Sequence, residues 1–87
     1  MVNIEFPSQE THDKSREVIL FLAVVDGKKI NCAISYETLR DHFGANYYDP
    51  VPAFVANRQR IEQLTTTLIR HGRFESDGAI LIKSQDM

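Results

Sequence analysis

The sequence predicts an α+β domain in which a mainly antiparallel, four-stranded sheet carries two helices on one face. Two apolar runs within residues 17–34 flank Asp26-Gly27, and this arrangement is a strong signal for a β-hairpin. Residues 50–71 repeat apolar side chains at helical spacing, and residues 79–83 form a last short apolar run. The expected order is therefore β-β-β-α-α-β, with both helices forming one layer on the sheet.

The expected first strand is Val2–Phe6, which alternates apolar and polar side chains and stops at Pro7. Residues 7–15 are polar, and we expect them to form a loop. A two-residue turn at Asp26-Gly27 fixes which side chains of the hairpin share a face, because directly paired residues point the same way. The inward apolar set is then Ile19, Phe21, Ala23, Ile30, Cys32 and Ile34, and the outward set includes Leu20, Leu22 and Val24.

Helix boundaries are expected at residues with capping chemistry. Ser35 is suited to cap a short helix that ends at Gly44. Asp49 followed by Pro50 is typical of a helix start, and the apolar stripe continues to Gly72, which predicts a helix of about six turns. The residues after the last strand are polar, and we expect them to form a frayed tail.

All 87 residues are expected to form a single small domain, since 43% are hydrophobic and 25% are charged. The single cysteine, Cys32, excludes an internal disulfide, and the N-terminus lacks the basic and apolar regions of a signal peptide. The longest apolar run, Val18–Val25, is much shorter than the roughly 20 residues of a membrane-spanning helix. These features predict a cytoplasmic protein with no membrane partner.

Several residues together resemble a known family. They are the Asp13–Arg16 segment, the Ile30–Ser35 run, and Phe54, Arg58, Ile61 and Ile69 on the long helix. This set is similar to the bacterial family called domain of unknown function 1488, over nearly the whole chain, and the Cys-Ala-Ile-Ser step is its most specific part. Where the family often has an aromatic residue before the Asp, this chain has His12. The resemblance implies a small α+β domain and no established activity.

The charge of the chain is unevenly distributed. The net charge of −2, from ten Lys and Arg against twelve Asp and Glu, excludes a generally basic binder of nucleic acid. Residues 50–74 nevertheless carry a net +3, all of it from arginine, which makes bidentate contacts with phosphate and carboxylate. Arg60, Arg70 and Arg73 are therefore candidate contacts for an anion, unless they pair with the protein's own acids. Arg58, near the apolar stripe, is expected to be a partly buried structural residue.

Two segments are candidate recognition loops. His12, Asp13 and Arg16 lie in the polar stretch, although Asp13 and Arg16 are also suited to brace the loop against itself. Tyr47 and Tyr48 lie between the helices, and at least one of them is expected to be partly exposed. They are candidates for contact with a partner or a small ligand, unless the aromatic residues here seal the end of the core.

No catalytic or metal-binding pattern is present in the sequence. We find no paired carboxylates, no Ser-His-Asp order and no phosphate-binding glycine loop, so we expect a non-enzymatic protein without a cofactor. Cys32 falls on the inward apolar face and is expected to be a buried thiol. His12, His42 and His71 lack the close, repeated spacing of metal ligands.

The main functional hypothesis is a protein-interaction or regulatory module that forms a homodimer. One layer of helices leaves the other sheet face bare, and an exposed apolar patch usually marks an interface. The candidate interface consists of Leu20, Leu22, Val24 and Leu81. Alternatively, residues 7–15 or the C-terminal tail cover that face. Two other functions stay open: a nucleic-acid-associated regulator that uses the arginine-rich helix, and a small-ligand binder near Tyr47-Tyr48.

Overall fold

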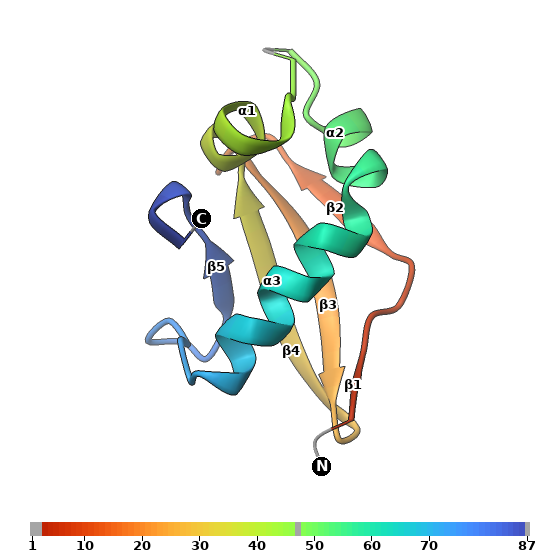
Figure 1. The fold of residues 1–87 in the computed structure, drawn as a ribbon, viewed down its shortest axis with the longest axis vertical. Coiled ribbons are helices and arrows are strands. Elements are labelled where there is room, and N and C mark those ends of the chain that lie inside the picture. The colour runs from red at the N-terminus through yellow and green to blue at the C-terminus, as the bar shows by residue number, and fades with distance from the viewer. Residues whose placement is uncertain (1–2, 47, 87) are drawn as a thin grey trace.

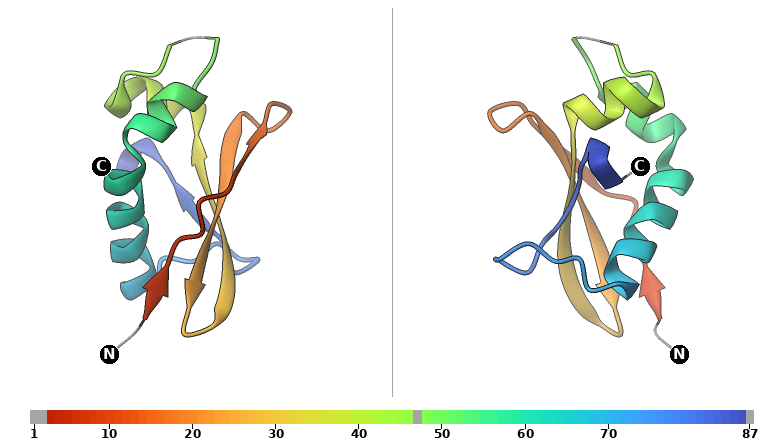
Figure 2. Two further views of the ribbon diagram at one scale, coloured as in Figure 1. Left: turned by 90° about the vertical axis from the view of Figure 1, so that its right-hand side faces the viewer. Right: turned by 60° about the vertical axis from the view of Figure 1, so that its left-hand side comes forward.

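The computed structural model describes residues 3–46 and 48–86 of the chain. These residues form an α+β fold in which the helices cover one face of a single sheet and leave the other face bare (Figures 1 and 2). In chain order the elements are β1 (Ile4–Glu5), β2 (Glu10–Asp13), β3 (Val18–Val25), β4 (Lys28–Ser35), α1 (Tyr36–Phe43), α2 (Val51–Ala56), α3 (Arg58–Arg70), β5 (Ile80–Ile82) and a final 3₁₀ turn, η1 (Ser84–Asp86). The predicted fold class is thus confirmed.

The β3–β4 hairpin is the centre of the sheet. Asp26 and Gly27 have φ values of 50° and 83°, which is the left-handed conformation that a two-residue hairpin turn requires at both positions. The predicted register is confirmed, since Phe21 pairs with Cys32 and Ala23 pairs with Ile30. The inward face of the hairpin therefore carries the apolar side chains that the helices bury.

Within the part of the chain that the structure describes, five strands form the sheet, one more than the sequence predicted. Both β1 and β2 pair antiparallel with the same edge of β3, and β5 pairs parallel with β4, so the sheet is mixed although mainly antiparallel. The prediction of a loop over residues 7–15 was wrong for Glu10–Asp13, which is strand β2. The expected first strand is shorter, Ile4–Glu5, and Val2 lies outside the described residues. β2 lacks apolar alternation, and its inward side chains are instead held by polar contacts with distant residues.

Helix α1 begins and ends where its capping residues predicted. The Ser35 hydroxyl oxygen accepts a hydrogen bond from the backbone N–H of Thr38 at 3.1 Å, and Gly44 adopts φ 69° at the C-cap.

The long helix predicted over residues 50–71 is broken at Asn57 into α2 and α3. The Asn57 side-chain amide donates to the carbonyl oxygen of Ala53 at 2.9 Å, and such side-chain bonds compete with the regular helical pattern. The helix start is shifted by one residue, with Pro50 at the N-cap, while the carboxylate of Asp49 accepts from the backbone N–H of Val51.

The core lies between the inward face of the sheet and the helices. Its members are Ile19, Phe21, Ala23, Cys32, Ile34, Leu39, Phe43, Phe54, Ile61, Leu68, Ile69, Ile80 and Ile82. Two threonines are also buried, and the hydroxyl of Thr65 donates to the carbonyl oxygen of Ile61 at 2.8 Å. No helix within the described residues is long and apolar enough to span a membrane.

The C-terminal residues pack against the helical layer, so the expectation of a frayed tail was wrong for residues 84–86. The Asp86 carboxylate accepts hydrogen bonds from the Arg73 guanidinium at 3.1 Å and from the backbone N–H of Lys83 at 2.9 Å. Ser84 donates to the carboxylate of Asp41 on α1 at 3.2 Å. The tail therefore lies on the helix-covered side of the sheet.

Candidate interaction surfaces

The helix-free face of the sheet carries a central strip of apolar side chains. Leu20, Leu22 and Val24 alternate along β3 with buried core residues, so they point away from the helices and are half-buried. The register places Leu20, Ala33 and Leu81 side by side across β3, β4 and β5. We call the set Val18, Leu20, Leu22, Val24, Ala33 and Leu81 the outer strip.

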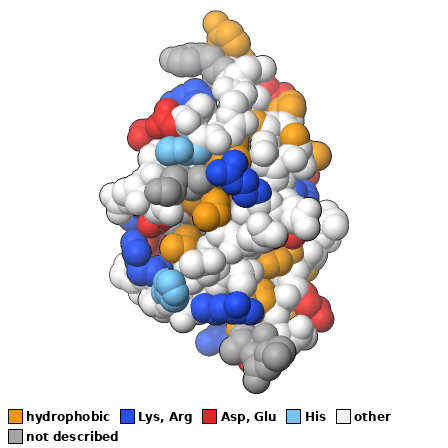
Figure 3. Space-filling view, viewed as in Figure 1, with side chains coloured by type: hydrophobic (Ala, Val, Ile, Leu, Met, Phe, Trp, Pro, Cys, Tyr) orange, Lys and Arg blue, Asp and Glu red, His pale blue; other side chains and the backbone are white. Residues whose placement is uncertain are grey.

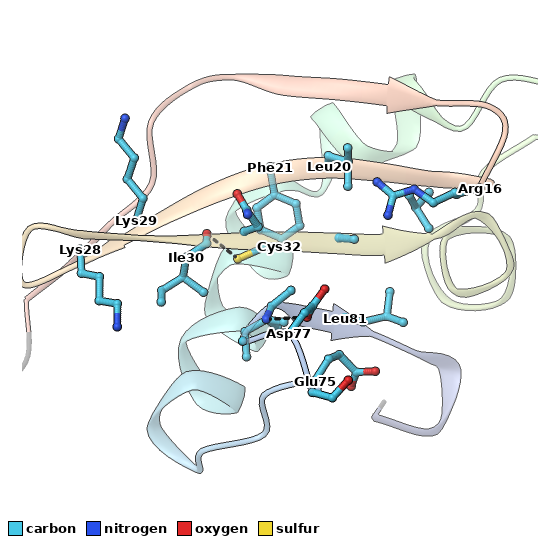
Figure 4. Close-up of a pocket in the computed structure, with 17 residues that line it drawn as sticks. Arg16, Leu20, Phe21, Lys28, Lys29, Ile30, Cys32, Glu75, Asp77 and Leu81 are labelled. Atoms are coloured by element: carbon cyan, nitrogen blue, oxygen red, sulfur yellow. Dashed lines mark hydrogen bonds between the residues drawn. The ribbon is translucent and has the colours of Figure 1, made fainter.

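Neither segment that the sequence offered as a cover lies over this face. Within residues 7–15, Glu10–Asp13 extends the sheet sideways as β2, and η1 packs beside α1 on the opposite side (Figure 2). Part of the outer strip is hollowed into a groove of about 890 Å³ (Figure 4). Lys28 and Lys29 lie at one end of the groove and Arg16 at the other, with Glu75 and Asp77 beside β5. The groove thus has a floor that is apolar apart from Asn31, and a rim that carries both signs of charge.

Asp13 and Arg16 brace the turn between β2 and β3. The Asp13 carboxylate accepts from the Arg16 Nε–H at 2.8 Å, from the Ser15 hydroxyl at 2.8 Å and from the Arg16 backbone N–H at 3.2 Å. The Arg16 side-chain hydrogen bond, followed by that of Ser15, lowers the pKa of Asp13 from 3.8 to about 2. These two candidate recognition residues therefore contact each other.

We expect Asp13 to make folding stability depend on pH between 3.8 and about 2. Because its pKa is lower in the folded chain, the unfolded chain takes up the proton first, so stability falls as the pH drops through this window. Urea unfolding at several pH values should show this loss in the wild type and not in Asp13→Asn.

Two neighbouring substitutions separate the hydrogen bond from the charge. Arg16→Gln should shrink the pH-dependent loss, because it removes the strongest contact with Asp13. Lys14→Gln removes an equal charge from an exposed side chain of the same turn and should leave the loss unchanged. Equal effects of both substitutions would contradict the assignment to the Arg16 hydrogen bond.

His12 faces the helical layer instead of an open loop. It lies on β2, is half-buried, and its Nε2 shares a hydrogen bond with the Tyr36 hydroxyl at the start of α1, with ring centroids 5.3 Å apart. Burial, with the nearby charges of Glu17, Asp13 and Asp49, raises the pKa of Tyr36. The prediction of His12 as a loop residue was therefore wrong, because residues 10–13 form a strand.

Tyr48 of the inter-helix loop is exposed to solvent. Tyr47 lies outside the described residues, and Tyr48 is 91% exposed, as expected for at least one of the pair. The side-chain oxygen of Asn46 accepts from the backbone N–H groups of Tyr48 and Asp49, each at 2.8 Å, and thereby shapes the loop.

Cys32 is buried as predicted. It is 1% exposed on the inward face of β4, and burial raises the pKa of its thiol to about 12. A thiol with this pKa is almost fully protonated at neutral pH and is a poor nucleophile. Within the part of the chain that the structure describes, no three His, Cys, Asp or Glu side chains gather as metal ligands.

Two of the helical-segment arginines pair with the protein's own acids. The Arg58 guanidinium pairs with Glu10 of β2, lies 4.0 Å from the Glu62 carboxylate and sits 5.0 Å from the centroid of the Phe54 ring. It is the partly buried structural arginine that the sequence predicted. Arg73 pairs with Asp86. Glu10 and Asp86 were not singled out in the sequence, because nothing local marks a carboxylate as the partner of a distant arginine.

Arg60 and Arg70 differ from these two. Arg60 lies with its guanidinium 5.1 Å from the centroid of the Phe43 ring, and Arg70 is exposed in the last turn of α3. Among the described residues neither forms an ion pair. Basic side chains accordingly gather on the face that α3 crosses (Figure 3).

Comparison with known proteins agrees with the resemblance seen in the sequence. Residues 4–82 match the family described as "Protein of unknown function (DUF1488)". The chain belongs to the DUF1488 family. The chain is also similar to the uncharacterized protein YrdB of Escherichia coli K12, with 29% identity over 76 residues, covering 86% of this chain and 89% of YrdB. YrdB of Shigella flexneri matches with the same identity and coverage.

A solved structure of a DUF1488 protein supports the fold. The crystal structure of a DUF1488 protein of unknown function from Shewanella loihica PV-4 matches this chain with a TM-score of 0.83 and 27% sequence identity. The match covers 91% of this chain and 90% of that one. The arrangement of strands and helices is therefore shared with another member of the DUF1488 family.

Proposed function

We propose that this DUF1488 protein is a non-enzymatic interaction module that forms a homodimer through the outer strip. The observation that carries the proposal is that no helix within residues 3–46 and 48–86 lies over the outer strip, where Leu20, Ala33 and Leu81 lie side by side. A contiguous apolar patch on a small protein is typical of a protein interface, because burying it removes apolar surface from water.

The charges around the groove support a second copy of the chain as the partner. In a twofold interface the same surface of both protomers is in contact, so every contact between two different residues occurs twice. Here the rim has Lys28 and Lys29 at one end and Arg16 at the other. Two acids lie beside β5, Asp77 and Glu75, and the Glu75 carboxylate is 3.6 Å from the Lys83 ammonium of the same chain. A twofold rotation is able to set the lysines of one protomer against the acids of the other on both sides of the apolar floor.

The size of the protein is compatible with such an interface. A standard interface buries about 800 Å² per partner, roughly one seventh of the 5556 Å² surface of this chain. One bare face of a five-stranded sheet is an extended surface of the kind that sheet-on-sheet packing uses.

The reactive side chains support a role in binding. The Cys32 thiol is buried and protonated, His12 is engaged by Tyr36, and the Asp13 carboxylate is engaged by the turn that it braces. His12 and Asp13 do not line the groove, and Cys32, which does, is only 1% exposed, so none of the three is presented there as an acid, base or nucleophile would be.

Leu22→Lys is expected to convert the homodimer into a monomer. The substitution places a charge within the outer strip, where twofold symmetry brings two copies of it into one interface, and we expect the dimer to weaken by about a hundredfold or more. Sedimentation velocity at micromolar concentrations measures the change. The matched control is Val55→Lys, since Val55 is a 52% exposed apolar residue on α2 and gains the same charge.

Two results would contradict the proposed homodimer. One is a wild-type protein that sediments as a monomer across the concentration range. The other is a Leu22→Lys variant that remains dimeric while its circular dichroism spectrum matches the wild type. A folded, dimeric Val55→Lys variant together with a folded, monomeric Leu22→Lys variant supports it.

A further inference from the structure

We infer that the solvent face of α3 is a second interaction surface, and that its partner is an acidic segment of another protein. This inference goes beyond the proposed homodimer, because α3 and the outer strip lie on opposite sides of the sheet (Figure 2). It rests on the positions of the arginines along α3, on which of them form ion pairs with acids of the same chain, and on the Phe43 ring against which Arg60 lies.

Four polar residues form a continuous stripe along the exposed side of α3. Arg60, Gln63, Thr67 and Arg70 follow one another at intervals of three and four residues, which places them on one side of a helix. All four are exposed. We call this set the arginine stripe. It contains hydrogen-bonding and cationic side chains and no carboxylate.

The positive charge of the arginine stripe is not cancelled within the described part of the protein. Arg58 and Arg73 each contact a carboxylate of the protein, whereas Arg60 and Arg70 form no ion pair among the described residues. The single acid of α3, Glu62, is turned toward Arg58, with 4.0 Å between the charged groups. Figure 3 shows basic side chains over this face of the molecule. A carboxylate brought by a partner is thus not in competition with an internal one.

Arg60 is also partly preorganised for binding. Its guanidinium lies 5.1 Å from the centroid of the buried Phe43 ring, a cation–π arrangement that restricts the side chain while leaving its edge N–H groups available. A guanidinium presents paired donors that match both oxygens of a carboxylate. Restricting the side chain beforehand lowers the entropy lost on binding.

The dimensions and the charge favour an acidic protein segment over nucleic acid. Arg70 follows Arg60 by ten positions along α3, which is a rise of about 15 Å. Carboxylates four or five residues apart on an extended peptide span roughly this distance. Nucleic acid binding usually requires a broad basic surface, and the chain as a whole carries a net charge of −2.

The test is fluorescence anisotropy with a labelled short poly-glutamate peptide, at low and at physiological ionic strength. We expect binding that weakens with salt. Arg60→Glu and Arg70→Glu should each weaken it by about fivefold to tenfold, and Arg70→Gln by a smaller factor. Lys14→Glu changes the net charge equally at an exposed residue in the β2–β3 turn, and should change binding by less than about twofold.

Each other outcome overturns the inference. Equal weakening of peptide binding by Lys14→Glu and Arg70→Glu would show that net charge alone determines binding. An absence of peptide binding at low ionic strength would show that the arginine stripe is not an interaction surface for acidic segments. Tighter binding of a labelled short duplex or single-stranded DNA than of the peptide would indicate that the partner of this surface is nucleic acid and not an acidic protein segment. Sedimentation of Arg70→Glu keeps the two proposals apart, because its oligomeric state should match the wild type.

Discussion

Phe54→Ala is expected to lower the free energy of unfolding by about 3–5 kcal/mol. Phe54 is 1% exposed, its ring centroid lies 5.5 Å from that of Phe21 on β3, and the Arg58 guanidinium stacks on it at 5.0 Å. Truncation to alanine leaves a cavity between α2 and the sheet and removes the surface that orients Arg58. A domain of this length is stabilised by about 0.05–0.15 kcal/mol per residue, so the loss is a large part of the total.

Urea unfolding monitored by circular dichroism measures this change. Phe54→Leu keeps much of the buried volume and should lose less stability than the alanine variant. The matched control is the next residue, since Val55 is 52% exposed and Val55→Ala should stay within about 0.5 kcal/mol of the wild type. A loss below about 1 kcal/mol for Phe54→Ala would show that α2 does not anchor the helical layer in the way described.

The Cys32 thiol is expected to react with a disulfide reagent at least about a thousandfold more slowly in the folded chain than in the unfolded chain. Only the thiolate attacks, and a pKa raised from 9.0 to about 12 leaves about a thousandfold less thiolate at a given pH. The 1% exposure of Cys32 adds a steric barrier to this effect. Reaction therefore requires the sheet and helices to separate.

Labelling kinetics followed by absorbance, with and without urea, provide the measurement. Ser76→Cys in a Cys32→Ala background is the control, because Ser76 is exposed and its thiol should react at the unfolded rate under both conditions. Phe54→Ala should accelerate labelling of Cys32, since both residues belong to one core. Rapid reaction of Cys32 in the folded wild type would contradict its assignment as a buried core thiol.

The parts of the fold that the sequence predicted well are those specified by neighbouring residues. Asp26-Gly27 determines the hairpin turn and with it the pairing of β3 with β4. Ser35 and Gly44 mark the ends of α1 through bonds and backbone angles formed within the helix itself. Such signals need no knowledge of the rest of the chain.

The parts that were not predicted depend on contacts between distant residues. β2 has a polar sequence, and its inward side chains are held by Arg58, which pairs with Glu10, and by Tyr36, which binds His12. The break at Asn57 was missed because the apolar stripe continues across it. The backbone of Asn57 leaves the helical conformation, with φ −113° and ψ 17°, and its side-chain amide donates to the carbonyl oxygen of Phe43, fourteen residues away, at 3.5 Å. In neither case does the local pattern contain the deciding interaction.

The candidate surfaces divide in the same way. Alternation along β3 was sufficient to place Leu20, Leu22 and Val24 on the outer strip. The rim of the groove was not predictable, because Glu75 and Asp77 reach it only through the parallel return of β5 beside β4. Similarly, the stacking of Arg60 on Phe43 joins two helices whose relative position the sequence does not show.

The short strands at both edges of the sheet have a consequence for aggregation. Val18–Val25 is an eight-residue apolar run without charge, proline or glycine, a composition that favours the cross-β packing of amyloid when its backbone is unpaired. In this fold it is interior, with β4 on one side and β1 and β2 on the other. The edges themselves are β1, β2 and β5, which are two, four and three residues long and offer little backbone to a growing fibril. The polar β2 strand thus also protects the chain's most amyloid-like segment from open-ended assembly.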